Sequence, residues 1–201
     1  MVAKMKKKGR RKVGSQRDLR KPEEKRKKAH PHASNPAHSK KAPGKRPVRK
    51  WKSIGVPKDI RPKNEYGQNF LVNPSVLDRE LEYAGIGPED RVLEIGPGTG
   101  NLTERLCQYA KSVCVIEIDR QFEAVLTEKQ KRFANLTVLW GDATEVEYPE
   151  FDKVVANLPY KVSLPIIFRL LEHSFHTGVL IIQERMAQRL AARPGQPGYS
   201  R

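Results

Sequence analysis

The sequence predicts an α/β fold in which helices cover both faces of a central, mostly parallel sheet. Along residues 64–201, short apolar segments alternate with segments whose apolar residues recur at helical spacing. The short segments are apolar throughout, which is typical of parallel strands buried on both faces. The first of them runs into a turn rich in glycine, and ligands of such sheets bind at the carboxyl ends of the strands.

Local signals mark each expected element in turn. Asn73 and Pro74 are typical of a helix cap followed by proline at the first helical position, and Gly85 ends this helix. Later helices are expected around residues 102–109, 122–133, 164–172 and 184–192. The expected strands are Arg91–Ile95, 112–118, Leu136–Trp140, Lys153–Asn157 and 178–183.

The net charge of +16 comes from one end of the chain. Residues 1–50 hold 20 of the 39 Lys and Arg residues but only three of the 23 acids, whereas residues 51–201 are close to neutral. Residues 1–63 also have few large apolar side chains and recurrent proline, so we predict a disordered basic tail before a domain over 64–201. Such a tail attracts polyanions by releasing their counterions. A solvated extension without a specific role and a nuclear targeting signal are the alternatives.

The composition also limits the class of protein. No apolar stretch is long enough to cross a membrane, and no signal peptide follows the basic N-terminus. Cys107 and Cys114 have no metal-ligand partners at suitable spacing, so we expect reduced thiols and no metal. These features predict a cytoplasmic protein, or a nucleolar or mitochondrial one in a eukaryotic cell.

The turn at residues 94–100 is the first candidate binding motif. An acid, Glu94, precedes three glycines at alternate positions, Gly96, Gly98 and Gly100. The glycines let the backbone turn sharply and approach a ligand closely. A dinucleotide-binding loop would have its third glycine one residue later and would bind a pyrophosphate. The acid suits a cationic ligand better, and S-adenosylmethionine has that character through its ammonium and sulfonium groups.

Two further acids stand at the ends of the next two strands. Glu117 follows Gly96 by 21 residues, where an acid can accept both hydroxyls of a ribose. Asp142 ends the third strand, where an acid can accept from the adenine amine. Either acid alone can equally be a helix cap. Three acids at successive strand ends favour a nucleoside site.

The fourth strand runs into Asn157-Leu158-Pro159-Tyr160, which we predict to be catalytic. An adenine amine is a poor nucleophile because its lone pair is delocalised into the ring. The Asn157 side-chain oxygen and the Leu158 carbonyl can accept from its hydrogens and localise that lone pair, while Pro159 fixes the turn. Tyr160 offers a ring on which an extruded base can stack, worth roughly 1–3 kcal/mol. The alternative for these four residues is an ordinary strand-to-loop turn.

Taken together, these motifs resemble the KsgA-type small-subunit rRNA adenine dimethyltransferases over about residues 64–201. The resemblance implies a Rossmann-like class I S-adenosylmethionine-dependent methyltransferase fold. It also implies cofactor contacts at Asn69, Leu71, Gly96, Gly98, Glu117, Asp142 and Asn157. The matching segments are Gly67-Gln68-Asn69-Phe70-Leu71, residues 94–100, Glu117-Ile118-Asp119, Gly141-Asp142-Ala143, Asn157-Leu158-Pro159-Tyr160 and Gln183-Glu184-Arg185 with Pro194-Gly195 and Tyr199.

The implied reaction is transfer of two methyl groups to each of two adjacent adenines of small-subunit rRNA during ribosome biogenesis. The implied partner is the pre-ribosomal small subunit, and we expect a monomer. The chain departs from the family at Lys161, where asparagine is frequent, and in its basic tail. Family members usually continue beyond the position of Arg201 with two strands and a small helical domain, so we expect the domain to be incomplete at its C-terminus.

Two other functions share these motifs. The related large-subunit rRNA adenine methyltransferase of the macrolide-resistance type has the same cofactor loop and catalytic motif. An assembly or transcription factor can keep the fold and bind nucleic acid without catalysis. An intact Asn157 to Tyr160 motif argues against a purely structural role.

Overall fold

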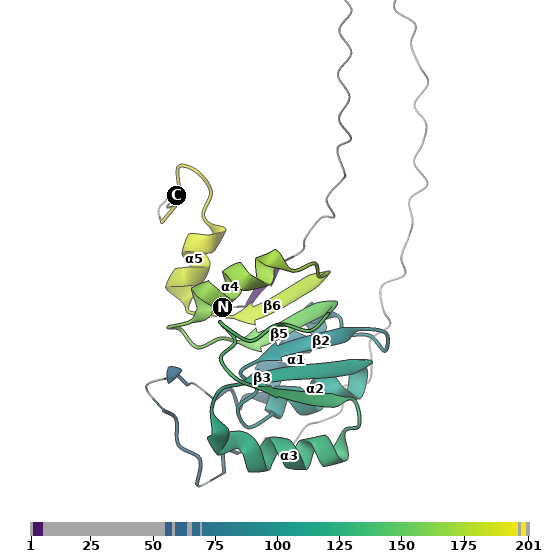
Figure 1. The fold of residues 1–201 in the computed structure, drawn as a ribbon. Helices are drawn as coiled ribbons and strands as arrows, with labels where there is room; N and C mark the ends of the chain where they lie inside the picture. The colour runs from purple at the N-terminus through teal and green to yellow at the C-terminus, as the bar shows by residue number, and fades with distance from the viewer. Residues whose placement is uncertain are drawn as a thin grey trace, which may run out of the picture. The chain divides into compact units, whose positions relative to one another are not determined.

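The computed structural model describes residues 2–5 (backbone only), 55–57, 59–63, 66–68, 70–196 and 198–199. These residues contain a six-stranded sheet in the order β1-β6-β5-β2-β3-β4 (Figure 1). The strands are β1 (Val2–Met5), β2 (Arg91–Ile95), β3 (Ser112–Glu117), β4 (Leu136–Trp140), β5 (Lys153–Asn157) and β6 (Thr177–Ile181). The helices are α1 (Pro74–Ala84), α2 (Asn101–Tyr109), the 3₁₀ turn η2 (Arg120–Phe122), α3 (Glu123–Arg132), α4 (Ser163–Glu172) and α5 (Glu184–Ala191).

The predicted parallel sheet is confirmed for β2 to β6. β2 lies between β3 and β5 and is parallel to both, with Ile95 opposite Ile116 on one side and Ala156 on the other. From β2 the chain proceeds outward to β3 and β4, and later returns to the other side of β2 for β5 and β6. The strand order therefore reverses at β2, which puts the glycine turn at the usual ligand position of such a sheet.

The N-terminal residues depart from the prediction of a disordered tail over 1–63. β1 pairs antiparallel with β6, from Val2 opposite Ile181 to Met5 opposite Gly178. A short edge strand is held by backbone hydrogen bonds, which composition does not reveal. Ile60 is also buried, against Phe122 and Leu126, so the packed domain begins before residue 64. Residues 6–54, which carry most of the predicted tail, lie outside the described residues.

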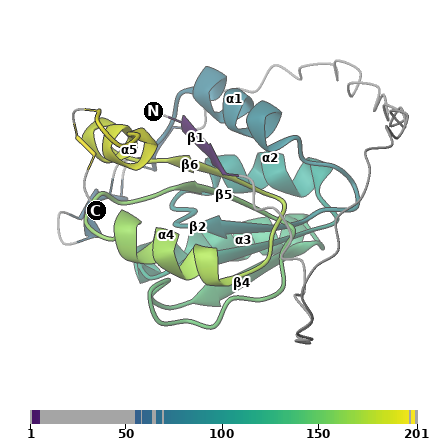
Figure 2. The same ribbon diagram turned by 90° about the horizontal axis from the view of Figure 1, so that it is seen from above.

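Alternate residues of each strand face opposite sides of the sheet, and each side has its own core. Val92 of β2 packs with Leu77 of α1 and Leu106 of α2. The next residue, Leu93, packs in the core on the other side of the sheet, together with Ile166 of α4. Figure 2 shows α4 on one face and α1 and α2 on the other. Helices thus cover both faces, as continuous apolar strands require.

The residues predicted to begin and end the first helix, α1, do so in the structure. Asn73 Oδ1 accepts from Ser75 N at 3.0 Å and caps α1, and Pro74 is its first residue. Gly85 ends α1 in the left-handed region with φ of 59°. β3 ends at Glu117 rather than at residue 118, because the chain turns there: Glu117 Oε1 accepts from Asp119 N at 2.8 Å.

Both cysteines are free thiols, as expected. Burial raises the pKa of Cys107 to about 12 and that of Cys114 to about 11. Both therefore stay protonated at neutral pH, which makes them unreactive. Within the described part of the chain, every helix is too short or too polar to cross a bilayer, and acids, histidines and cysteines form no cluster that could hold a metal ion.

Candidate active site

The glycine turn after β2 is tied to β3 through its backbone. Gly96 N donates to Ile116 O at 2.9 Å, and Gly98 N donates to Glu117 Oε2 at 3.0 Å. Gly96 has φ of 70°, and a Cβ built on it would meet no atom within 4 Å. The backbone at Gly96 therefore faces open space, as close approach to a ligand requires.

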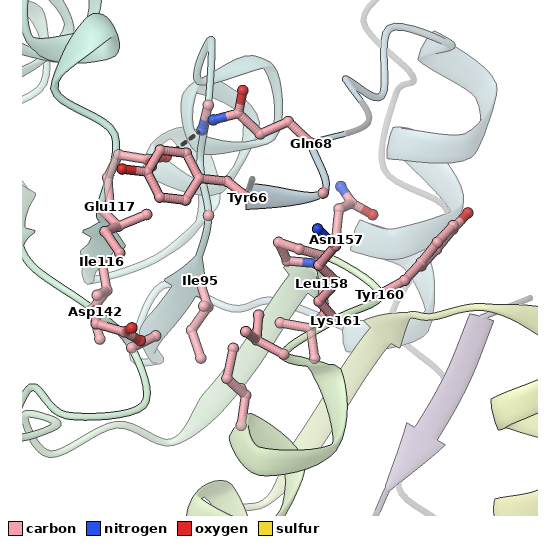
Figure 3. A pocket seen from close by; sticks show the side chains of 18 of the residues that line it. Tyr66, Gln68, Ile95, Ile116, Glu117, Asp142, Asn157, Leu158, Tyr160 and Lys161 are labelled. Carbon is pink, nitrogen blue, oxygen red and sulfur yellow. Dashed lines mark hydrogen bonds between the residues drawn. The ribbon is translucent and has the colours of Figure 1, made fainter. Parts of the chain in front are cut away.

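A cavity of about 450 Å³ opens at the carboxyl ends of the parallel strands. In Figure 3, Glu117 and Asp142 lie on one side of it, and Asn157 and Tyr160 lie on the other. The cavity brings together the predicted site residues apart from Asn69, which lies outside the described residues, and Glu94, whose carboxyl is buried behind the loop. Those that line it are Leu71, Gly96, Gly98, Glu117, Asp142, Asn157, Leu158, Pro159 and Tyr160.

The Glu117 carboxylate is almost fully buried at the end of β3. Oε1 accepts from Asp119 N and Oε2 accepts from Gly98 N, at 2.8 and 3.0 Å. Burial raises the pKa of Glu117, and these backbone donors oppose the rise because they stabilise the charged form. Each oxygen accepts one of these bonds and keeps a lone pair for a further donor such as a hydroxyl.

Asp142 combines both roles considered for a strand-end acid. Oδ1 accepts from the backbone N and from the side-chain oxygen of Thr144, each at 2.7 Å, and so caps the turn that follows β4. The residue also lines the cavity. The capping role uses Oδ1, so a ligand amine would be recognised through Oδ2.

Residues 158–162, which follow β5, form a short turn into α4. Leu158 N donates to Ile181 O at 3.0 Å, and the Leu158 side chain is buried in the core. Leu158 also lines the cavity. Ser163 Oγ donates to Pro159 O at 2.7 Å and fixes the start of α4. The Tyr160 side chain is 48% exposed at the cavity mouth, beside Lys161.

The side-chain oxygen of Asn157 has an unusual environment. Oδ1 is shielded from solvent and has no hydrogen-bond partner among the described residues, although Asn157 lines the cavity. An unpaired buried acceptor costs roughly 1–3 kcal/mol, and natural proteins pair nearly all such groups.

Glu94 does not have the position that its sequence context favours. Its carboxyl is buried behind the loop, accepts from Thr103 Oγ1 at 2.7 Å, and is absent from the cavity lining. Burial raises the pKa of Glu94 to about 8, and the nearby carboxyls of Glu80 and Glu117 add to the rise. The alternation of β2 explains this: Glu94 faces the α2 side, opposite to Ile95.

The raised pKa of Glu94 predicts a loss of stability with rising pH. An unfolded Glu94 releases its proton near its ordinary pKa of 4.5, whereas the folded one keeps it to about 8. The free energy of unfolding should therefore fall between these pH values, by up to about 1.4 kcal/mol per pH unit from this group. Glu94→Gln keeps the shape and does not titrate. Urea unfolding from pH 5 to 8 should show a shallower decline for Glu94→Gln, and parallel declines would contradict the assignment.

One wall of the cavity carried no independent signal in the sequence. Tyr66, Gln68 and Phe70 line it, and Phe70 packs edge-on against Phe122 at 5.7 Å between ring centroids. Asp119 holds this wall in place. Its two carboxylate oxygens accept from Lys63 Nζ at 2.8 Å and from Gln68 Nε2 at 2.7 Å.

The Lys63 ammonium and the other donors hold the pKa of Asp119 below its usual range, although burial pushes it upward. Asp119 stands two residues after Glu117, in a motif that the resemblance included without a role. Asp119 fixes this wall through Lys63 and Gln68, which lie more than 50 residues before it along the chain.

Comparison with known proteins agrees with this geometry. The ribosomal RNA adenine dimethylase family matches residues 60–201. A protein of Thermococcus gammatolerans, named probable ribosomal RNA small subunit methyltransferase A, is 43% identical over 143 residues, which are 71% of this chain and 51% of that protein. A relative of the same name from Methanothermobacter thermautotrophicus is 46% identical over 142 residues, covering 71% and 52%. The chain spans about half the length of these relatives.

Solved structures show the same likeness in three dimensions. A dimethyladenosine transferase from Plasmodium falciparum is 42% identical with a TM-score of 0.61, over 64% of this chain and 48% of that one. The 23S rRNA methyltransferase ErmE is 32% identical with a TM-score of 0.56, over 60% and 50%. The predicted class I methyltransferase fold is confirmed. Since the family match covers well over half of the sequence, the chain belongs to the ribosomal RNA adenine dimethylase family.

Proposed function

We propose that this chain binds S-adenosylmethionine and directs its methyl group to the exocyclic amine of adenine in small-subunit rRNA. The observation that carries the proposal is the cavity itself, which brings Asn157, Leu158 and Tyr160 together at the carboxyl ends of the parallel strands. The opposite side of the same cavity holds two acids. An amine donor beside Asn157 and a nucleoside beside those acids would satisfy both sides.

The cofactor side of the cavity fits an adenosyl group. Glu117 offers two carboxylate oxygens for the ribose hydroxyls, and Asp142 offers Oδ2 for the adenine amine. The open space over Gly96 lets the backbone approach the ligand, and any side chain there would fill that space. When bound, S-adenosylmethionine supplies a methyl group that its sulfonium has already activated.

The catalytic side needs to polarise and position the base. Asn157 Oδ1 and the Leu158 carbonyl accept from the two hydrogens of the amine, so its lone pair becomes localised on nitrogen. Buried acceptors are effective here because little water competes for the amine. Tyr160 is exposed enough to stack on a base that has left its helix. Positioning and polarisation of this kind require no strong general base.

Small-subunit rRNA is the preferred substrate because the curated relatives carry that name at 43% and 46% identity. We infer dimethylation of two adjacent adenines during ribosome biogenesis, with the pre-ribosomal small subunit as partner. The alternative substrate is large-subunit rRNA, because the fold also matches ErmE with a TM-score of 0.56.

Tritiated cofactor distinguishes these substrates. The chain is incubated with immature small subunits, large subunits and a duplex DNA control, and the labelled nucleosides are then mapped. We expect label in N6-methylated adenines of small-subunit rRNA alone. Label confined to large subunits would favour the alternative, and cofactor binding without transfer to any of the three would contradict the proposal.

The basic residues of the N-terminal segment provide a separate prediction about RNA affinity. Changing the Lys and Arg residues of 9–50 to Gln removes positive charge but leaves Val2–Met5 unchanged. We expect weaker binding to small-subunit rRNA and a lower slope of log affinity against log salt, because fewer counterions are released. Cofactor affinity should not change. An unaltered salt slope would show that these residues make no contact with phosphates.

A further inference from the structure

Arg169 of α4 holds the turn that follows β4 by two of its backbone carbonyls. Nη1 donates to Ala143 O at 3.1 Å, and Nη2 donates to Val146 O at 2.9 Å. A guanidinium presents its donors as a rigid planar fork, so the two bonds fix the orientation of the turn as well as its distance. The bonded residues are 26 and 23 positions apart in the sequence, so Arg169 ties the turn to a separate element.

Tyr148 binds one of the same carbonyls. Its Oη donates to Ala143 O at 2.6 Å, so this oxygen accepts two bonds, which is the number its lone pairs allow. The guanidinium carbon of Arg169 lies 4.7 Å from the centre of the Tyr148 ring, in cation–π contact. Ala143 and Tyr148 are both buried, so little water competes for these bonds.

The turn that Arg169 holds is the one that carries Asp142. The backbone oxygen of Asp142 accepts from Val146 N at 2.8 Å, and its Oδ1 accepts from Thr144 N at 2.7 Å. The turn is thus a small hydrogen-bonded unit, which Arg169 holds at Ala143 and Val146. Asp142 and Ala143 are neighbours in the chain, and both line the cavity. A shift of the Ala143 carbonyl would therefore move the Asp142 carboxylate as well.

The helix that carries Arg169 begins at the turn that would receive the substrate base. Ser163 is the first residue of α4, and its Oγ donates to Pro159 O at 2.7 Å. Arg169 stands six residues later, which is about 9 Å further along the axis of a regular helix. Ile166, between them, is buried in the core and also lines the cavity. The helix therefore sets the separation between the turn for the base and the turn of Asp142.

We propose that Arg169 is a positioning residue, which holds the Asp142 turn against α4 and thereby presents Asp142 Oδ2 to the adenine amine of the cofactor. The inference rests on the proposed function, since it takes Asp142 as the acceptor for that amine. Arg169 does not line the cavity and acts only through the turn. A base with a carbonyl oxygen in place of the amine cannot donate this bond, so the placement of Oδ2 decides how strongly adenine is preferred.

The test compares the binding of two ligands, S-adenosylhomocysteine and S-inosylhomocysteine, in which a carbonyl oxygen replaces the adenine amine. Calorimetry with each ligand gives a ratio of affinities. The wild type should prefer the adenosyl ligand about 10- to 100-fold, because the amine donates to a charged acceptor. Arg169→Met keeps an apolar stem without donors, and it should lower this ratio about tenfold. A side chain that only stabilised the fold would change both affinities alike and leave the ratio constant.

Two milder variants keep the test open if Arg169→Met fails to fold. Arg169→Lys retains the charge and a donor for one carbonyl at a time, so it should keep a ratio between those of the wild type and Arg169→Met. Tyr148→Phe keeps the ring and removes one of the two bonds to Ala143 O, so it should lower the ratio about two- to threefold. A wild-type ratio in both milder variants would contradict the proposal.

Arg91→Met is the matched control. Arg91 holds the other end of the same β4–β5 connection, through Nη2 and Nε bonds to Asp152 that are both 3.1 Å long. It stands at the amino end of β2, whereas the cavity lies at the carboxyl ends of the strands. Arg91→Met should therefore lose stability and keep the wild-type ratio of affinities.

Amide hydrogen exchange without ligand separates this inference from the proposed function. Val146 N donates to Asp142 O, and its exchange should quicken at least about tenfold in Arg169→Met but not in Arg91→Met. An unchanged ratio of affinities in Arg169→Met, or an equal fall in Arg91→Met, would overturn the positioning role alone. Equal binding of both ligands by the wild type would instead count against Asp142 as the acceptor in the proposed function, and the role of Arg169 in selectivity would fall with it.

Discussion

Asn157→Ala should lower kcat for methyl transfer about 10²- to 10³-fold, the usual loss when one buried polar group at a reacting centre is removed. Alanine removes the acceptor Oδ1, so the lone pair of the amine stays delocalised. The Leu158 carbonyl remains and accounts for residual activity. Cofactor affinity should stay within a few fold, because Glu117 and Asp142 lie on the other side of the cavity. The measurement is single-turnover transfer to small-subunit rRNA, together with calorimetry of cofactor binding.

Asn135→Ala is the matched control for this variant. It removes an amide of the same size just before β4, at the amino ends of the parallel strands, whereas the cavity lies at their carboxyl ends. Loss of its two hydrogen bonds should reduce stability by about 1–3 kcal/mol but leave kcat unchanged. Equal losses of kcat in the two variants would assign the effect of Asn157→Ala to the fold. A fully active Asn157→Ala would remove the residue from the reaction.

The site residues that could be predicted from the sequence have one property in common: each stands at or just after the end of an expected strand. Gly96 and Gly98 follow a strand directly, and Glu117, Asp142 and Asn157 each end one. The carboxyl ends of parallel strands meet at one edge, so position along the chain was enough to bring these residues together. The cavity contains all of them.

The parts that the sequence did not predict depend on partners far along the chain. Arg169 lies among the apolar residues of α4, and nothing local shows that its guanidinium reaches the carbonyls of Ala143 and Val146. Asp119 likewise acquires a role only when Lys63 and Gln68 reach it. Single-sequence patterns report which face a residue occupies, and they do not report which polar groups meet in the interior.

The same distinction explains β1. Its four residues have no strong strand pattern and follow the composition of a basic tail. These residues form a strand because their backbone pairs with that of β6, which would otherwise be an exposed edge of the sheet. An edge is a property of the assembled sheet, so it has no counterpart in the sequence of residues 2–5.

Glu117→Ala should weaken cofactor binding about 10²-fold. Two hydrogen bonds from ribose hydroxyls to a buried carboxylate contribute about 1.5 kcal/mol each, and a tenfold change in affinity corresponds to about 1.4 kcal/mol. Calorimetry with S-adenosylhomocysteine measures this loss. Glu123→Ala removes the same charge from the exposed start of α3, where Glu123 pairs with Arg120, and should leave affinity unchanged.

Loss of Glu117 also frees the backbone donors of Gly98 and Asp119, so the loop itself can relax. A ligand that lacks the 2′-hydroxyl separates these two effects. If Glu117 binds the ribose directly, the wild type should bind the deoxy analogue more weakly than the parent ligand, and Glu117→Ala should bind both equally, because the coupling between residue and hydroxyl is gone. An equal preference for the parent ligand in both proteins would mean that Glu117 supports the loop and makes no contact with the ribose.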